Sequence, residues 1–142
     1  MTENDYTYTE GMTDRETEER LREANTGVLA LARDGDAYAI PVACHYDGEA
    51  VVLRLGDHEG SEKMAYLETT DRASLVLYGY APPDESWSVV VRGPVVQVEA
   101  AGESSSPGAD PFLPIRIFGE PVDAVDEVLY ELVTESVTGR RT

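Results

Sequence analysis

Two tight turns centred on Asp-Gly constrain this chain more than any other feature. Asp34-Gly35 and Asp47-Gly48 stand on either side of the apolar segment 37–46, with further apolar runs at 27–33 and 50–55. An Asp-Gly pair favours the positive φ angles of the short turns that join antiparallel strands. Two such turns between apolar runs predict three consecutive antiparallel strands, a β-meander, in the N-terminal half.

A helix is predicted on each side of this meander. The segment 13–25 begins with Thr13 and Glu16 in capping-box spacing, and its thin apolar stripe suits a short helix on the surface. A second helix is expected from about Ser61 to Thr69, after the loop that follows the third strand.

The second half of the chain is predicted to contain two or three strands and a final helix. The strands are expected at 72–80 and 86–100, with a bulge or bend at Gly93-Pro94, and a short one at 115–118. A C-terminal helix is expected over about 121–136, because the apolar residues there recur at helical spacing: Val125, Val128, Leu129, Leu132 and Val133.

No internal repeat and no linker divides the sequence, so a single domain over 1–142 is predicted. Short antiparallel strands with helices placed between them are typical of an α+β protein built on a small barrel. The barrel is expected to span about 27–118.

The charge of the chain limits its partners. It has 11 basic against 28 acidic residues, a net charge of −17, and nucleic-acid binding depends on Lys and Arg contacts, so no nucleic-acid partner is expected. No apolar run approaches the ~20 residues that span a bilayer, and the N-terminus lacks the profile of a secretion signal, so we expect a cytoplasmic protein that does not enter a membrane. Scattered acidic residues with almost no lysine favour a salt-rich, haloarchaeal cytoplasm; an ordinary acidic protein is the alternative.

Lys63 is the only lysine, and it lies in the first turn of the helix expected after Ser61. A helix N-terminus has unpaired N–H groups and a positive dipole end, which suit a phosphate. Arg54, at the end of the preceding strand, offers a second positive charge. The alternative is a solvent-exposed Lys63 that pairs with Glu59 or Glu62.

No other group of residues predicts catalysis or metal binding. His45 and His58 are the only histidines, and neither has around it the three or four converging ligands that a metal site requires. Cys44, the only cysteine, is expected to be a buried, inert thiol. We assign no catalytic acid, base or nucleophile, and we predict no metal.

Several motifs follow one another in a fixed order: Gly27-Val28-Leu29-Ala30, Pro41-Val42, the Asp47-Gly48 turn, Arg54-Leu55-Gly56, Gly60-Ser61-Glu62-Lys63 and Trp87-Ser88-Val89-Val90-Val91-Arg92-Gly93. In this order and spacing the chain resembles the pyridoxamine 5′-phosphate oxidase-like flavoproteins. Within them it is most similar to the small FMN-binding branch that includes nitroimidazole-resistance proteins. The resemblance covers about residues 12–100.

The resemblance implies an antiparallel split β-barrel with short flanking helices, which forms a homodimer and holds FMN in clefts between the subunits. Arg54, Ser61 and Lys63 would hold the phosphate of FMN. The isoalloxazine ring would lie along the backbone near 41–43, and Ser88 and its neighbours, from either chain, would contact the flavin. The cofactor-binding residues implied are Pro41, Val42, Ala43, Arg54, Leu55, Gly56, Ser61, Lys63, Trp87, Ser88 and Val89.

The function implied is that of an FMN-dependent oxidoreductase acting on an unidentified small substrate. The basic substrate-binding residues of true pyridoxamine phosphate oxidases are not recognisable in this chain, and the family often has another residue type where Arg54 stands. Two alternatives stay open. The first is the same fold with another ligand, because related split barrels bind a deazaflavin or haem. The second is a non-enzymatic module that binds flavin or serves dimeric interactions.

Overall fold

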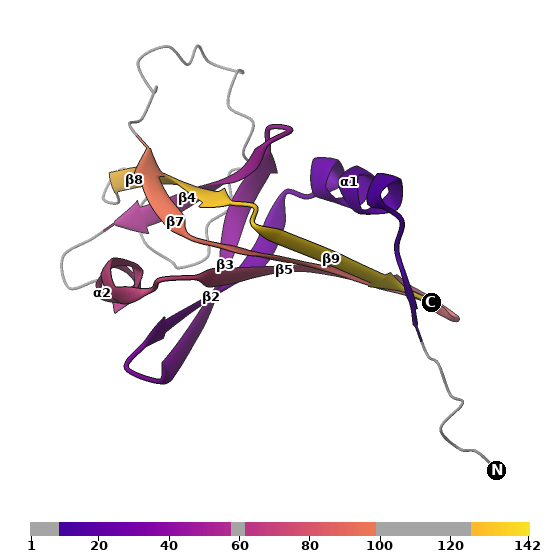
Figure 1. The fold of residues 1–142 in the computed structure, drawn as a ribbon, viewed down its shortest axis with the longest axis horizontal. Helices are drawn as coiled ribbons and strands as arrows, with labels where there is room; N and C mark the ends of the chain where they lie inside the picture. Colours follow the sequence, from indigo (N-terminus) through magenta and orange to yellow (C-terminus); the bar gives the residue numbers. More distant parts are fainter. Residues whose placement is uncertain (1–8, 58–61, 99–125) are drawn as a thin grey trace.

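The computed structural model describes residues 9–57, 62–98 and 126–142. These ranges contain nine strands and two helices, and Figure 1 shows how they are arranged. In chain order they are β1 (Glu10–Gly11), α1 (Asp14–Glu23), β2 (Thr26–Arg33), β3 (Asp36–Tyr46), β4 (Ala50–Asp57), α2 (Glu62–Thr69), β5 (Ala73–Ala81), β6 (Glu85–Gly93), β7 (Val95–Val98), β8 (Asp126–Val133) and β9 (Ser136–Arg141).

The predicted meander is confirmed. β2 pairs antiparallel with β3, and β3 pairs antiparallel with β4. At the first turn Asp34 has a φ of 50° and Gly35 a φ of 81°, and at the second Gly48 has a φ of 101°. Two successive positive φ angles match the right-handed twist of the strands that they join, which is why Asp-Gly is favoured there.

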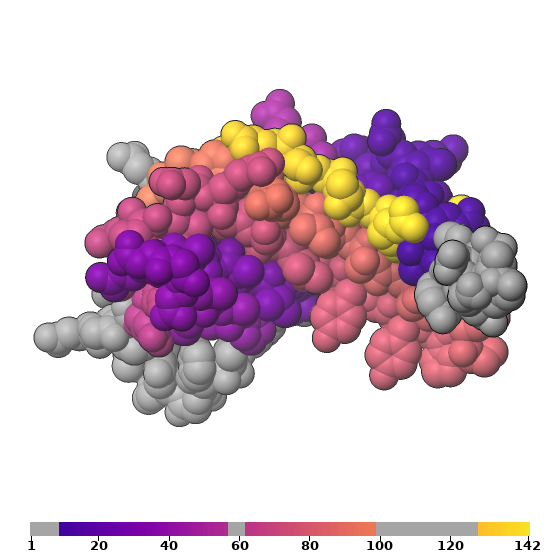
Figure 2. Space-filling model, turned by 60° about the horizontal axis from the view of Figure 1, so that its bottom comes forward, coloured from indigo at the N-terminus to yellow at the C-terminus, as the bar shows by residue number. Residues whose placement is uncertain are grey.

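The nine strands form one sheet that returns on itself. Their order is β1-β9-β6-β5-β2-β3-β4-β8-β7, and β6 runs directly into β7 as β8 runs into β9. β6 pairs with β9 and β7 pairs with β8, so these two long bent strands close the ring that β5, β2, β3 and β4 begin. The yellow C-terminal residues, whose strands β8 and β9 pair with β7 and β6, accordingly lie beside pink and orange residues in Figure 2. The fold is the predicted α+β split barrel.

The bend predicted at Gly93-Pro94 is confirmed, and it forms the seam of the barrel. The Val133 N–H donates to the Pro94 carbonyl at 2.9 Å, and the Glu135 N–H donates to the Arg92 carbonyl at 3.1 Å. Gly93 is buried between these bonds, and a Cβ placed on it would overlap the carbonyl oxygen of Val133. Only glycine therefore lets the two bent strands approach this closely.

Alternate residues of the strands fill the interior of the barrel. The side chains of Leu29, Leu53, Leu75, Val89 and Leu132 are among those with no more than 2 % exposure. Their alternation with half-buried or exposed residues gives one apolar face per strand, as the strand period of two requires.

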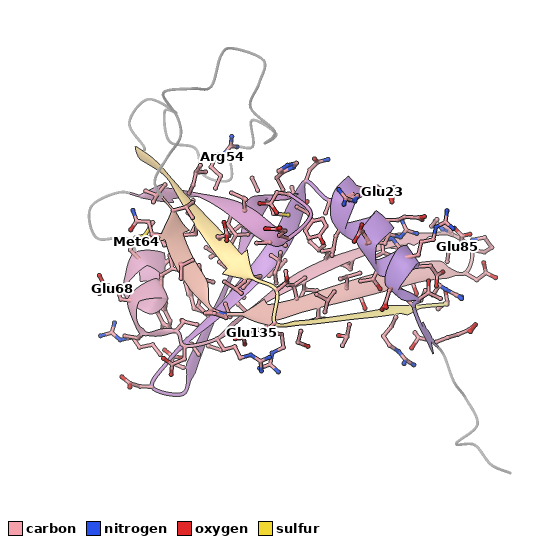
Figure 3. All side chains as sticks on the ribbon, turned by 45° about the horizontal axis from the view of Figure 1, so that its top comes forward. Glu23, Arg54, Met64, Glu68, Glu85 and Glu135 are labelled. Carbon is pink, nitrogen blue, oxygen red and sulfur yellow. The ribbon has the colours of Figure 1, made fainter. Side chains whose placement is uncertain are left out.

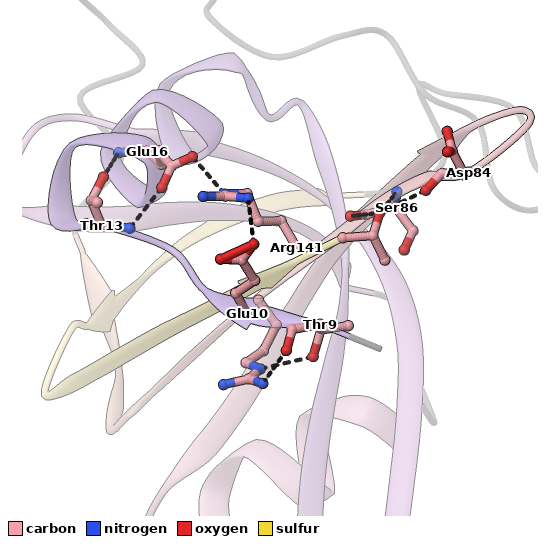
Figure 4. A network of polar contacts seen from close by, with 9 residues as sticks. Thr9, Glu10, Thr13, Glu16, Asp84, Ser86 and Arg141 are labelled. Carbon is pink, nitrogen blue, oxygen red and sulfur yellow. Dashed lines mark hydrogen bonds and ion pairs between the residues drawn. The ribbon is translucent and has the colours of Figure 1, made fainter. Parts of the chain in front are cut away.

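The helix α1 covers the end of the barrel where the paired strands β5, β6 and β9 extend as an arm, called the β5–β6–β9 arm. Its capping box is present as predicted, because the Glu16 N–H donates to the Thr13 hydroxyl and the Thr13 N–H donates to the Glu16 carboxylate. The same carboxylate accepts from Arg141 Nε at 2.7 Å, which ties α1 to β9 (Figure 4). The guanidinium of Arg20 lies 4.4 Å from the centre of the Trp87 ring on β6.

The predicted C-terminal helix is wrong for the part that the structure describes. Residues 126–133 and 136–141 are the strands β8 and β9, whereas 121–125 lie outside the described residues. The barrel therefore extends to Arg141 rather than ending near 118.

The spacing of the apolar residues in β8 fits both the period of a helix and the period of a strand. Val128, Tyr130 and Leu132 occupy alternate positions and pair with Leu55, Leu53 and Val51 on β4. An edge strand with unpaired N–H and C=O groups requires a partner, and β8 supplies it over the whole length of β4. Pairing with β4 thus decides against the helix.

Three further expectations concern the remaining segments. The second helix is confirmed as α2 and runs from Glu62 to Thr69. The short strand expected at 115–118 lies outside the described residues. In the ranges that the structure covers, neither helix has the length and apolar character needed to cross a membrane.

Candidate functional site

Lys63 is buried in the first turn of α2. Its exposed fraction is 8 %, although it is the only lysine in a chain with a net charge of −17. A buried ammonium group is costly unless it is paired, and across the described ranges no buried side-chain nitrogen or oxygen lacks a hydrogen-bond partner. The alternative of a solvent-exposed Lys63 is therefore wrong. Lys63 is a buried residue.

The helix that carries Lys63 closes one end of the barrel. Met64 contacts the hydroxyl of Tyr130 on β8, with the oxygen 3.6 Å from the sulfur. Figure 3 shows Met64 and Glu68 on α2, well apart from Arg54, which projects from β4. The two basic residues predicted to hold a phosphate lie on different elements, Arg54 on β4 and Lys63 on α2.

Arg54 lies on the outer face of the barrel. Its neighbours Leu53 and Leu55 are buried, while Arg54 is half-buried, so its side chain points away from the core. It pairs with Ala43 on β3 and with Leu129 on β8. Residues directly opposite in an antiparallel pair share a face of the sheet, so Ala43 belongs to the same outer surface.

A strip of small apolar residues continues this surface across β2 and β3. Val28 pairs with Pro41, and Ala30 pairs with Ala39. All four share the parity of Ala43 and therefore lie on the outer face. Ala39 and Pro41 are exposed on this face, Val28 and Ala30 are half-buried, and Ala43 is buried, with an exposed fraction of 4 %.

The eleven residues predicted to bind a cofactor divide into three groups. Those that the strand pairing places on the outer face are Pro41, Arg54, Gly56, Ser88 and Ala43, of which Ala43 is buried, with an exposed fraction of 4 %. Those directed inward are Val42, Leu55, Val89 and the half-buried Trp87, of which Val89 has an exposed fraction of 0 %. Lys63 lies on α2, and Ser61 lies outside the described residues.

The structure brings only some of these residues together. Pro41, Ala43 and Arg54 lie on the neighbouring strands β3 and β4. Ser88 is on β6, and β5, β2 and β3 separate β6 from β4 in the sheet. Within one chain, therefore, the segment 87–89 forms a separate group.

Two exposed tyrosines were not recognised from the sequence, where they resemble ordinary strand residues. Tyr78 and Tyr80 on β5 have exposed fractions of 66 % and 77 %. They pair with Ser88 and Ser86 on β6 and so share the outer face with them. Tyr78 and Tyr80 are exposed because β5 lies in the β5–β6–β9 arm.

A second feature that the sequence did not reveal is the contact of α2 with the β2–β3 hairpin. The hydroxyl of Tyr66 donates to Asp36 at 2.8 Å, and its ring stacks on Tyr38 with 4.9 Å between ring centres. Asp36 and Tyr66 are 30 residues apart in the sequence, and no local motif predicts their contact.

The described residues include neither an activated thiol nor a cluster of metal ligands. Burial raises the pKa of the Cys44 thiol to about 12, so it is not an activated nucleophile. His45 is half-buried on β3 and pairs with Val52, and His58 lies outside the described residues. In the ranges that the structure covers, no three His, Cys, Asp or Glu residues converge as metal ligands.

An open cavity of about 480 Å³ lies between α1 and β9. Its lining includes Asp14, Glu18, Tyr46 and Arg140. None of the eleven predicted cofactor-binding residues lines it, so this cavity is separate from the surface around Arg54.

The chain belongs to the family described as "Pyridoxamine 5'-phosphate oxidase", whose sequence profile matches residues 13–141. This confirms the resemblance seen in the sequence. None of the curated proteins matches the chain.

Solved structures show the same fold. A FAD-binding protein from Mesorhizobium loti has a TM-score of 0.71 at 20 % identity, over 94 % of this chain and 98 % of that one. The FAD-binding protein from Mycobacterium smegmatis has a TM-score of 0.68 at 17 % identity, over 92 % and 96 %. A candidate 5-nitroimidazole antibiotic resistance protein from Bacteroides thetaiotaomicron has a TM-score of 0.67 at 15 % identity, over 94 % and 87 %.

Proposed function

We propose that this protein binds FMN and is an FMN-dependent oxidoreductase. The observation that carries the proposal is the burial of Lys63, the only lysine, in the first turn of α2. A chain this acidic gains nothing for solubility from one buried cation, whereas a cofactor phosphate requires one. Membership of the family, and the FAD-binding proteins among the similar structures, support a flavin as the cofactor.

The outer surface of β2 to β4 is the proposed seat of the flavin ring. The apolar side chains of the half-buried Val28 and the exposed Pro41 suit a flat hydrophobic ring, and Arg54 on the same face offers a positive charge. Ser61 and Lys63, at the start of α2, would then take the phosphate. The inward residues Val42, Leu55, Trp87 and Val89 would support this surface from beneath or contact the ligand through their main chain.

The redox chemistry would belong to the cofactor. A bound flavin would supply hydride-transfer chemistry, and the chain would bind and orient it. The substrate itself is small and unidentified.

We further propose that two copies of the chain associate through the outer face of the β5–β6–β9 arm. Tyr78 and Tyr80 expose large aromatic surfaces there, beside Ser88. Aromatic residues are enriched in protein interfaces. A second copy would bring its own Ser88 to a flavin on the neighbouring chain, which one chain alone does not do.

A salt-rich cytoplasm remains the proposed setting. The support is the net charge of −17, because self-repulsion of this size is relieved when salt screens it. Experiments on the protein are therefore best done in concentrated potassium chloride.

The first test is the visible absorption spectrum of the purified protein, followed by denaturation and mass analysis of the released ligand. Two flavin bands with FMN released would support the proposal. Release of FAD would correct the identity of the cofactor, and a deazaflavin or haem spectrum would replace it. A colourless protein that does not bind added FMN would refute it. Oxidation of reduced nicotinamide would distinguish an enzyme from a flavin-binding module.

The phosphate contact is tested by Lys63→Met, which keeps the apolar stem and removes the charge. A hydrogen bond to a charged group is worth about 1.5–3 kcal/mol. FMN affinity should therefore fall by roughly ten- to a hundredfold. Riboflavin, which lacks the phosphate, should bind as before. Arg15→Gln, at a site whose side chain is 90 % exposed, is the matched control. Equal loss of both ligands would contradict the assignment.

A further inference from the structure

The helix α2 is held in place by contacts with the β2–β3 hairpin. The Tyr66 hydroxyl donates to Asp36 Oδ2 at 2.8 Å, and the two rings of Tyr66 and Tyr38 stack with an angle of 19°. Tyr66 is itself buried, with an exposed fraction of 8 %. The hydrogen bond thus joins a buried helix residue to the first residue of β3.

A second set of contacts fastens the C-terminal end of the same helix. The Thr70 hydroxyl accepts from the Ala32 N–H at 3.1 Å, and it lies 3.0 Å from the Ala32 carbonyl and 2.6 Å from the Tyr66 carbonyl. The helix is therefore attached to β2 at its end and to β3 through Tyr66. Its first turn, which carries Lys63, follows the loop from β4.

An isolated helix of this length has no stable orientation of its own. α2 has eight residues, and helices shorter than about 12 residues are marginal in water without tertiary contacts. Its rotation about its axis must therefore be set by the residues that pack against the barrel. Tyr66 is the one of these that combines a ring stack with a directed hydrogen bond.

Lys63 and Tyr66 lie three residues apart and so share one face of α2. Both side chains have exposed fractions of 8 %. We infer that Tyr66 is a positioning residue: its hydrogen bond to Asp36 fixes the rotation of α2 and thereby aims Lys63 at the phosphate of the bound flavin. This inference rests on the proposed function.

The protonation of the pair suits this role. The hydrogen bond to Asp36, followed by burial and the charge of that carboxylate, raises the pKa of Tyr66 above its ordinary value. The phenol therefore stays protonated and remains a donor at neutral pH. The other charged neighbours are Glu62, whose charge acts in the same direction, and Arg33, whose charge opposes it.

The test is Tyr66→Phe, which removes the hydroxyl and keeps the ring that stacks on Tyr38. FMN affinity should fall about three- to tenfold, the range of one hydrogen bond, while riboflavin affinity stays unchanged. Asp36→Asn keeps an acceptor and should retain wild-type affinity, whereas Asp36→Ala should reproduce Tyr66→Phe. Tyr38→Phe keeps the stacked ring and is the matched control.

A double variant shows whether Tyr66 acts through Lys63. In the Lys63→Met background, Tyr66→Phe should cause no additional loss of FMN affinity. Equal losses for FMN and riboflavin, or an additive loss in the double variant, would overturn the positioning role and leave the proposed function intact. A wild-type protein that binds FMN no better than riboflavin would overturn the phosphate contact itself, and this inference with it.

Discussion

Replacing Gly93 by alanine should open the seam that closes the barrel. The added Cβ would overlap the carbonyl oxygen of Val133, which is a main-chain atom and cannot turn away as a side chain would. The strand that carries Val133 must therefore move. On either side of this point are the hydrogen bonds from the Val133 N–H to Pro94 and from the Glu135 N–H to Arg92, at 2.9 and 3.1 Å.

The cost follows from these contacts. Losing two hydrogen bonds costs about 1 kcal/mol each, and overpacking a tight site adds about 1–3 kcal/mol. We therefore expect the free energy of unfolding to fall by about 3–5 kcal/mol, which lowers the Tm by roughly 6–20 °C in a domain of this size. A typical domain has about 5–15 kcal/mol of stability, so the variant should still fold.

The assay is urea unfolding followed by the fluorescence of Trp87, the only tryptophan, which lies on β6 in the same strand as Gly93. The matched control is Gly11→Ala, because a Cβ there would meet only Arg140, at an ordinary 3.9 Å. That variant should stay within about 0.5 kcal/mol of the wild type. If Gly93→Ala also stayed within this range, the two bent strands would not pack as closely as described.

Three other predictions concern separate parts of the molecule. Cys44, with its pKa raised to about 12 by burial, should react with a thiol reagent at pH 8 only after the chain is unfolded in urea, and rapid labelling of the native protein would show that the site opens. The backbone hydrogen bond with Thr13, more than the contact with Arg141, lowers the pKa of Glu16 in the folded state. The ionised carboxylate therefore stabilises the fold at pH values above its ordinary pKa of 4.5, and this contribution is lost as the pH falls through the lowered pKa. The difference in urea midpoint between wild type and Glu16→Gln should therefore be largest near neutral pH and shrink in acid, and a constant difference would argue against it. Replacing Tyr78 and Tyr80 together by serine should convert the proposed dimer to a monomer in sedimentation analysis, and an unchanged sedimentation coefficient would place the interface elsewhere.

The comparison of sequence and structure is most informative at α2. The sequence placed this helix correctly and singled out Lys63, because a lone lysine after a loop is visible in the chain itself. It did not distinguish an exposed lysine from a buried one. That distinction came from the barrel end against which α2 packs, including the contact of Tyr66 with Asp36, 30 residues away.

Local chemistry decided those elements that the sequence determined by itself. The Asp-Gly turns require positive φ angles, the capping box requires Thr13 and Glu16 three residues apart, and Gly93-Pro94 interrupts a ladder of hydrogen bonds. Each of these is a property of a few adjacent residues. The sequence therefore predicted the meander, the first helix and the bend.

The tertiary structure alone decided the C-terminal segment. The apolar residues from Val128 to Val133 satisfy the helical period and the strand period alike, so the pattern could not select one. The open edge of β4 selected the strand, because its main-chain groups lose their contact with water as the barrel forms and must be paired. The same closure left Tyr78 and Tyr80 exposed on β5 and Lys63 buried on α2, since exposure and burial depend on strands that meet only in the folded barrel.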